Sequence, residues 1–367
     1  MKIYYDYQIC IGQKFGGISR YYYELMHYIE QLGLGKADMN CIGSVNKYFE
    51  SYLGYNAYPK REGLVGTGLF FIKDFLNRVQ TFFKVQKGYD IVHPTYYNSY
   101  LANYPKNGAK LVTTVYDMTH EKFTDMFSKR DPTIRQKKKM LFKADHIIAI
   151  SESTKRDILQ FYPEIPEEKI SVIYIGSSFS CQKKVENNGK FPEKYILFVG
   201  QRGGYKNFDT FFEAARQILD QYTGLSLVCI GGGAFSGEER IKMEGYLHRI
   251  VQIDASDDEL TYAYSHALCF IFPSMYEGFG IPTLEAFTCG CPVVLSNTSS
   301  MPEVGGDAVE YFDPNDATEI ASQINKVLLD ENLREEMRQK GYKQLEKFDW
   351  KVITKQIIEC YQKVMQE

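Results

Sequence analysis

The feature that most constrains the fold is a regular alternation of short β-rich runs with longer amphipathic runs. In the first half, strands are expected at residues 2–7, 38–42, 89–93, 109–115, 146–150 and 170–174. A second series follows at residues 195–199, 226–230, 250–253, 268–272, 293–295 and 309–311. Runs with helical spacing separate most of these strands, as in 18–32 after Gly16 and Gly17 and in 152–162 after the expected N-cap Ser151. Such alternation is typical of an α/β fold with a parallel sheet.

The chain is long enough for two domains, because 367 residues exceed what one compact core usually contains. The alternation stops at residues 177–191, where Ser, Lys, Asn and Gly dominate, and resumes at 195. We therefore predict two Rossmann-like domains that face each other across a cleft and bind ligands at the carboxyl ends of their strands. The predicted boundaries are 1–178 for the first domain, 179–193 for a linker and 194–350 for the second domain.

Charge excludes one class of function. The net charge of −3 argues against nucleic-acid binding by the molecule as a whole. Residues 129–143, however, contain seven basic residues and the single acid Asp131, beside the apolar run 140–142. Two interpretations stay open: a solvated helix face, or a patch that meets anionic lipid or a pyrophosphate-linked acceptor.

The run 69–87 is rich in phenylalanine at helical spacing and is very apolar for an exposed helix. We expect it to pack in a core; contact with a membrane or an acceptor is the alternative.

The eight cysteines contain no C-x-x-C pair, and several lie in apolar runs, which favours a reducing compartment. No stretch reaches the roughly 18 apolar residues of a spanning helix, and no signal-type region opens the chain. We expect a soluble cytoplasmic protein, with a peripheral position at the inner face of the membrane as a further possibility.

The strongest local signal is the segment 273–286, which follows the strand 268–272. Its glycines let backbone N–H groups approach a ligand, and Pro282 is expected as the first residue of a helix, so that the segment forms an anion site suited to a diphosphate. Glu285, expected in the first turn, can accept hydrogen bonds from two ribose hydroxyls. Glu277 would reach the sugar side of the diphosphate. The alternative is an ordinary connection with two unrelated glutamates.

A second cluster, residues 200–207, follows the first strand of the same domain. Its glycines, the cations Arg202 and Lys206, and Asn207 as the expected N-cap of the next helix describe a phosphate cradle. The alternative is a turn with surface cations.

Two further loops of the first domain carry candidate residues. Gly16 and Gly17 join a strand to a helix and can bring backbone amides to the diphosphate. Asp117 and His120 follow the strand that ends at Val115, where side chains can bind substrate hydroxyls or carry a proton. A structural role for His120 is the alternative.

No metal site is expected. The acidic run 254–259 precedes a helix and is explained by capping and first-turn charge. Charge on a leaving diphosphate would then be met by Arg202 and Lys206.

With these residues identified, nearly the whole chain resembles the family 4 retaining glycosyltransferases, which have the GT-B fold. The resemblance depends on the Glu-x7-Glu motif from Glu277 to Glu285 and on the pair Arg202 and Lys206. It is supported by the Gly16-Gly17 loop and by the segments 149–153, 292–302 and 348–350. It implies that the last helix, about 351–367, packs back on the first domain.

The resemblance also implies roles for individual residues. Arg202 and Lys206 would bind the donor diphosphate, Glu285 the ribose and Glu277 the donor sugar. The amides of Gly17, Gly280 and Ile281 would bind phosphate or sugar oxygens, and Phe279 would also contact the donor. Many members have a histidine where this sequence has Tyr116, so His120 or Asp117 would take its role.

The loop 15–21 resembles that of bacterial polysaccharide mannosyltransferases that use GDP-mannose. The expected function is metal-independent transfer of a hexose from a nucleotide sugar to a glycan or lipid-linked acceptor, with retention and without a cofactor. The alternatives are a UDP-sugar donor, a GT-B sugar-nucleotide 2-epimerase and a non-catalytic sugar-nucleotide-binding subunit.

Overall fold

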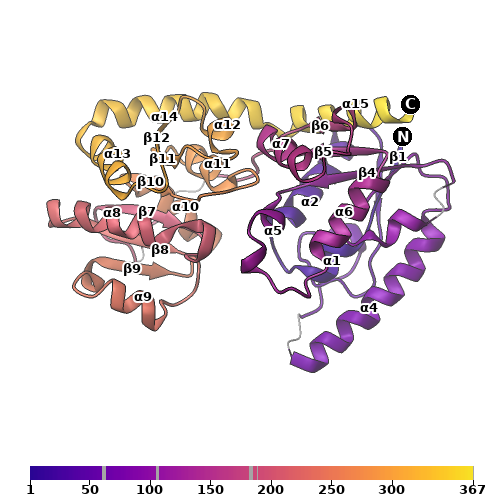
Figure 1. Cartoon of the computed structure of the whole chain (residues 1–367), viewed down its shortest axis with the longest axis horizontal. Helices are drawn as coiled ribbons and strands as arrows, with labels where there is room; N and C mark the ends of the chain where they lie inside the picture. The colour runs from indigo at the N-terminus through magenta and orange to yellow at the C-terminus, as the bar shows by residue number, and fades with distance from the viewer. Residues whose placement is uncertain (60–62, 105–106, 182–184, 188, 367) are drawn as a thin grey trace. The chain divides into compact units, whose positions relative to one another are not determined.

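The computed structural model describes the chain except for residues 60–62, 105–106, 182–184, 188 and 367 (Figure 1). The chain divides into two compact units. The first contains residues 1–176 and 349–367, and the second contains residues 177–348. The predicted linker 179–193 includes residues 182–184 and 188, which lie outside the described residues.

The first unit is built on a six-stranded parallel sheet in the order β2-β1-β3-β4-β5-β6. Its strands are β1 (Lys2–Tyr5), β2 (Lys36–Met39), β3 (Ile91–His93), β4 (Lys110–Val115), β5 (His146–Ala149) and β6 (Ile170–Val172). Its helices are α1 (Gln8–Gly12), α2 (Gly17–Gln31), α3 (Glu50–Leu53), α4 (Gly63–Lys84), α5 (Thr119–Lys122), α6 (Thr133–Lys143), α7 (Glu152–Phe161) and α15 (Trp350–Gln366), with 3-10 turns η1 (Ser99–Asn103), η2 (Thr124–Met126) and η3 (Glu167–Lys169). As predicted, Ser151 caps α7 by accepting a hydrogen bond from the Thr154 amide at 3.0 Å.

The last helix, α15, packs on the first unit. Its Tyr361 hydroxyl lies 2.6 Å from His93 Nδ1 and 3.2 Å from the Tyr5 hydroxyl, and all three side chains are buried. At its start, the Trp350 ring lies against Gly176, where an added Cβ would come within 2.4 Å of the indole. Helix α15 thus completes the core of the first unit, although the whole second unit separates it in sequence from β6.

The second unit is built on another six-stranded parallel sheet, in the order β12-β11-β10-β7-β8-β9. Its strands are β7 (Tyr195–Val199), β8 (Ser226–Ile230), β9 (Ile250–Ile253), β10 (Cys269–Phe272), β11 (Val293–Ser296) and β12 (Val309–Phe312). Its helices are α8 (Phe208–Gln221), α9 (Gly237–Lys242), α10 (Asp257–His266), α11 (Ile281–Thr288), α12 (Met301–Gly305), α13 (Ala317–Leu329) and α14 (Glu331–Leu345), with 3-10 turns η4 (Gly204–Lys206), η5 (Leu247–Arg249) and η6 (Glu346–Phe348). The strands β7, β10 and β11 are neighbours, so the loops at their carboxyl ends meet at one sheet edge. The predicted α/β architecture with two Rossmann-like domains is confirmed.

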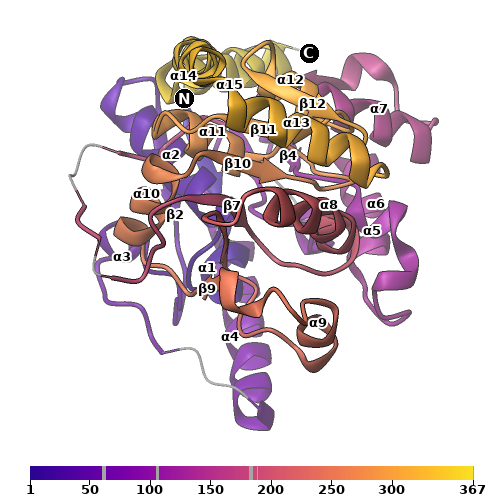
Figure 2. The same ribbon diagram turned by 90° about the vertical axis from the view of Figure 1, so that its left-hand side faces the viewer.

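The prediction that 69–87 packs in a core is wrong for one side of this helix. Along α4, the side chains of Phe71, Phe75 and Phe83 are 64%, 65% and 62% exposed. Figures 1 and 2 both show α4 at the margin of its unit. The helix is present as predicted, but its apolar face points outward because polar side chains on the opposite face hold the helix to the sheet.

The basic run 129–143 is only partly a solvated face. Lys137 on α6 is completely buried and forms an ion pair with Glu121 at 2.8 Å. The other six basic residues are exposed. Within the described part of the chain, none of the helices is both long enough and apolar enough to cross a membrane.

Candidate functional site

The loop between β7 and α8 carries the first group of predicted site residues. Strand β7 ends at Val199, and Gly200 turns the chain with φ 136° before Arg202. Turn η4 and then Asn207, which adopts a left-handed conformation with φ 58°, lead into α8. This backbone places Arg202 and Lys206 on one short loop at the carboxyl end of the sheet.

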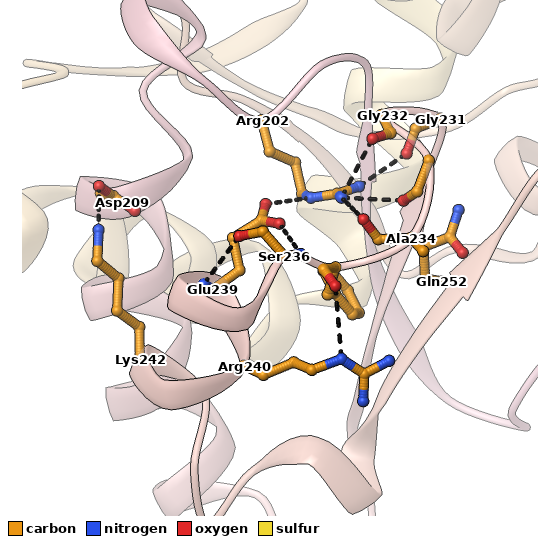
Figure 3. Close-up of polar contacts among 12 residues, drawn as sticks. Arg202, Asp209, Gly231, Gly232, Ala234, Ser236, Glu239, Arg240, Lys242 and Gln252 are labelled. Atoms are coloured by element: carbon orange, nitrogen blue, oxygen red, sulfur yellow. Dashed lines mark hydrogen bonds and ion pairs between the residues drawn. The ribbon is translucent and has the colours of Figure 1, made fainter.

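Arg202 is buried and fully engaged with protein groups (Figure 3). Its Nε donates to Glu239 Oε1 at 2.6 Å, and its terminal nitrogens donate to the Gly231 and Gly233 carbonyls at 2.8 and 2.9 Å. The guanidinium also lies 4.6 Å from the centre of the Phe235 ring. Arg202 therefore fixes the loop after β8, and a diphosphate would have to share its N–H groups with these carbonyls.

Glu239 links Arg202 to the start of α9. It completes a capping box with Ser236, whose side chain accepts from the Glu239 amide while the Glu239 carboxylate accepts from the Ser236 amide. Burial acts to raise the pKa of Glu239, but the hydrogen bonds from Arg202 and Ser236 outweigh it and lower this pKa below its usual value. A cavity of about 440 Å³ lies beside this pair, lined in part by Gly203 and Gly204.

Lys206 and Glu277 meet across two loops. The Lys206 Nζ lies 2.5 Å from Glu277 Oε1, and both side chains are only partly exposed. The loops that carry them are also joined through the backbone, because the Met275 amide donates to the Tyr205 carbonyl at 2.8 Å. The structure thus brings together Lys206 and Glu277, which the sequence analysis predicted to bind the same nucleotide sugar.

Two serines that the sequence reasoning did not single out hold the Glu277 loop in place. The Glu277 amide donates to the Ser299 hydroxyl at 3.0 Å. The Ser300 hydroxyl donates to the carbonyls of Glu277 and Phe279 at 2.9 and 3.0 Å. Both serines follow β11, the neighbour of β10, within the segment 292–302 that carried part of the family resemblance. Their position after a strand was the signal that could have identified them.

Gly280 starts helix α11 in a left-handed conformation with φ 103° and ψ 45°. An added Cβ would lie 3.1 Å from the Met301 sulfur, so both the backbone and the space favour glycine here. The first helical residue is Ile281, and Pro282 is the second, which corrects the expected helix start by one residue. The amide of Ile281 remains within the first turn, as an anion site requires.

Two local predictions about capping and the first turn are wrong. Glu285 is the fifth residue of α11 and lies beyond its first turn, where Oε2 accepts from the Tyr264 hydroxyl at 3.2 Å. Asn207 precedes α8 but makes no side-chain cap, because its amide group donates to the Pro273 and Pro314 carbonyls at 3.1 and 2.6 Å. The Asn207 side chain thus ties the β7 loop to the β10 and β12 loops.

In the first unit, Gly16 and Gly17 stand at the start of α2. Gly17 is the first helical residue, and the Gly16 carbonyl accepts from the Arg20 amide at 3.0 Å. A Cβ on Gly16 would lie 2.4 Å from Gln13 Oε1. Helix α2 is fifteen residues long, and no bulky side chain covers the backbone amides at its N-terminus.

Asp117 and His120 lie on the loop after β4. Asp117 Oδ1 accepts from the Thr119 amide at 2.9 Å, and the Asp117 carbonyl accepts from buried Lys137 at 3.0 Å. The His120 ring stacks on Phe127 with centres 3.9 Å apart, and its Nε2 lies 3.8 Å from Asp131 Oδ2. His120 Nδ1 is buried without a hydrogen-bond partner in the described structure. It is therefore a group that a substrate hydroxyl could satisfy.

Tyr116, at the position where many family members carry a histidine, is a packing residue. Its ring is buried between Tyr21 and Tyr97, at centre distances of 5.9 and 6.1 Å. Among the side chains described, no three His, Cys, Asp or Glu residues lie close enough together to hold a metal ion.

Solved structures with this architecture define the fold class. A glycosyltransferase from Rickettsia africae aligns over 100% of this chain and 99% of its own, with a TM-score of 0.71 and 17% identity. Anabaena Alr3699/HepE, solved in complex with UDP and glucose, aligns over 98% and 99% with a TM-score of 0.73 and 16% identity. The fold is that of the GT-B glycosyltransferases.

The family follows from the sequence. Residues 15–177 match the family described as Glycosyltransferase Family 4, and residues 181–344 match Glycosyl transferases group 1. The chain belongs to glycosyltransferase family 4.

Bacterial mannosyltransferases are among its relatives. O-antigen chain mannosyltransferase B of Escherichia coli is 30% identical over 263 residues, covering 70% of this chain and 61% of that protein. O-antigen chain mannosyltransferase RfbU of Salmonella typhimurium is 29% identical over 218 residues, covering 58% and 60%. The chain spans only 29% of a third relative, serotype-specific mannosyltransferase WbdA of Escherichia coli.

Proposed function

We propose that this protein is a retaining glycosyltransferase that moves a hexose from a nucleotide sugar to a glycan or lipid-linked acceptor in bacterial surface polysaccharide synthesis. The leading donor is GDP-mannose, because mannosyltransferases of O-antigen chains are among the relatives. The observation that carries the proposal is the contact between Lys206 and Glu277 beside the start of α11.

In this proposal the donor diphosphate lies against the loops after β7 and β10. Lys206 and the Ile281 amide bind the negatively charged diphosphate oxygens. Arg202 contributes further positive charge, and its N–H groups donate both to the diphosphate and to the carbonyls of residues 231–234. Glu285 binds the ribose from the second turn of α11, and Glu277 binds a hydroxyl of the donor sugar. In the first unit, the start of α2 at Gly17 is by itself suited to bind an anion.

The proposed chemistry is substitution on the front face of the sugar. The bond between the anomeric carbon and the diphosphate oxygen lengthens, the acceptor hydroxyl oxygen bonds to that carbon from the same side, and its proton passes to a diphosphate oxygen. No metal is required, since protein cations and the α11 start stabilise the leaving diphosphate. In the first unit, Asp117 or His120 is the group proposed to bind a substrate hydroxyl.

One experiment tests donor, outcome and metal requirement together. The protein is screened by thermal shift against GDP-mannose, UDP-glucose and related donors, since a ligand at 100 times its Kd adds about 2.7 kcal/mol of stability. The stabilising donor is then incubated with acceptors and EDTA, and the anomeric configuration of the product is read by NMR. An inverted product, or activity lost with EDTA, contradicts the mechanism.

The same assay separates the alternatives. A UDP-sugar donor has one supporting observation, the Anabaena structure with UDP and glucose, which shares the fold. If the donor alone becomes an epimerised nucleotide sugar, the protein is an epimerase. Donor binding without transfer or hydrolysis, whichever acceptor is supplied, identifies a non-catalytic binding subunit.

A further inference from the structure

Helix α4 faces its own unit with polar side chains. Asn77 is buried and exchanges hydrogen bonds with the Ile42 backbone, at 2.7 Å from the Ile42 amide and 3.0 Å to its carbonyl. One turn on, Thr81 Oγ1 lies 3.0 Å from the Tyr4 hydroxyl, and one turn back Asp74 Oδ1 accepts from the Tyr7 hydroxyl at 2.8 Å. A row of polar groups at helical spacing therefore anchors α4 to the sheet.

The opposite side of α4 is apolar and exposed. Phe71, Phe75, Val79 and Phe83 repeat at intervals of four residues, and all four are exposed. Ile72 and Leu76 widen this row and are exposed too. A surface helix of a globular protein normally buries its apolar side. In α4 the polar side faces the unit and the apolar side faces outward. An exposed apolar patch of this extent marks an interaction surface.

The charge around this apolar face is positive. Residues 63–87 contain four basic residues and one acid, which gives +3, although the whole chain carries −3. The one acid of this segment, Asp74, is paired with Arg78 at 2.7 Å, and Lys84 lies 3.9 Å from Asp38 on β2, so the excess positive charge rests with Lys73 and Lys87. A positively charged surrounding suits an anionic surface. It disfavours a two-fold contact between two copies of this face, which would bring like charges together.

A cavity of about 420 Å³ lies at the N-terminal half of the same helix. Its wall is largely apolar, with contributions from Ile11, Val45, Leu69 and Phe70, and it contains Lys73. An apolar cavity beside a lysine suits a hydrocarbon chain whose phosphate stays at the rim.

We propose that α4 is a membrane-docking helix, which places its outward apolar face in the surface of an anionic lipid bilayer. An exposed apolar row with basic residues beside it is the pattern of helices that lie in the plane of the interface. The reversed orientation leaves the unit intact when the face enters lipid, because the polar side already holds the helix. This inference extends the proposed function by bringing the enzyme to lipid-linked acceptors, but docking itself needs neither donor nor transfer.

The test measures binding of the full chain to vesicles. The protein is sedimented with vesicles of phosphatidylcholine alone and with vesicles that also contain phosphatidylglycerol, in the absence of any donor. The variant F71S/F75S/F83S is compared with the control I241S/L329S, which removes two side chains that are 73% and 69% exposed in the second unit. We expect the parent and the control to bind anionic vesicles, and the triple variant to bind at least about tenfold more weakly.

Two further measurements complete the test. Thermal unfolding of the triple variant is expected to match the parent, because the three side chains are exposed. Donor binding without vesicles is also expected to match the parent, so that a failure of docking is distinguishable from a failure of the proposed function. Equal vesicle binding by parent and triple variant overturns the proposal. A parent dimer that the triple variant converts to monomer also overturns it, by making a second copy the occupant of this face.

Discussion

Lys206 and Glu277 lie 71 positions apart in the chain, yet their charged groups are 2.5 Å apart. The pair joins the loop after β7 to the loop after the neighbouring strand β10. Without a bound anion, Glu277 neutralises the lysine and holds its long side chain in the site. A diphosphate would find the cation already positioned, which is how an enzyme limits the reorganisation needed in the transition state.

The first prediction concerns this cation. Lys206→Ala should lower kcat by about 10²–10³, by analogy with the loss of one oxyanion donor. Lys206→Arg should retain part of the rate, because it keeps the charge with a different geometry. Initial rates of transfer with the donor found by thermal shift provide the measurement. Lys326→Ala serves as the matched control, since Lys326 forms an exposed ion pair with Glu310 on the same unit. A Lys206→Ala enzyme as fast as the parent would show that the diphosphate lies elsewhere.

The second prediction separates the structural role of Arg202 from its charge. Glu239→Gln keeps a hydrogen-bond acceptor for Arg202 but removes the negative charge that now offsets the guanidinium. Donor affinity should therefore rise by about threefold to tenfold, the effect of roughly 1 kcal/mol in binding. Isothermal titration of the donor into parent and variant measures this change. The neighbouring Glu238→Gln is the control. Unchanged or weaker donor binding by Glu239→Gln alone would argue against a diphosphate near Arg202.

The third prediction tests the entry to α11. Gly280→Ala should destabilise the second unit by about 1–3 kcal/mol, because alanine is strained at φ 103° and its Cβ presses on Met301. Donor binding should weaken with it, since the Ile281 amide moves. Gly224→Ala is the control, because a Cβ there meets nothing within 4 Å. Urea unfolding followed by circular dichroism measures both variants, and similar midpoints would refute the assignment of strain to Gly280.

Much of the architecture was predictable because buried parallel strands have a simple pattern. All twelve strands of the described residues occur where short β-rich runs are expected, and their ends differ by three residues at most. The Glu277 loop was predictable for a related reason: a strand followed by glycines and a proline leaves little choice of local structure. A binding site formed by the backbone of one continuous segment can therefore be predicted from the sequence.

The orientation of α4 and the partners of Arg202 were not predictable. Helical periodicity identifies two faces but not which face meets the sheet, and that choice depends on Asn77 finding the backbone of Ile42, 35 residues away. Arg202 is bound by carbonyls about 30 residues later, which leave no side-chain signature. Contacts between distant segments that use backbone groups are invisible to local reasoning.

The last prediction concerns pH and the attachment of α15. Burial lowers the pKa of His93 to about 3, and its two ring nitrogens lie 2.6 Å from the Tyr361 hydroxyl and 2.9 Å from Thr114 Oγ1. In the unfolded chain the histidine pKa is about 6.5. Between these two values the unfolded state binds a proton that the folded state does not, so the free energy of unfolding should fall as the pH falls below about 6.5. The slope from this one group is about 1.4 kcal/mol per pH unit.

The measurement can use the single tryptophan, Trp350, which is buried in the first unit at the start of α15. Urea unfolding followed by its fluorescence at pH 5, 6, 7 and 8 reports the free energy of unfolding of that unit. His93→Gln should be less stable than the parent at pH 8, because it disturbs the hydrogen bonds to Tyr361 and Thr114, and the difference should shrink as the pH falls. His27→Gln, at an exposed position on α2, should leave the pH dependence unchanged. If the parent and His93→Gln lose stability in parallel from pH 7 to pH 5, His93 is not the group that makes the attachment of α15 sensitive to acid.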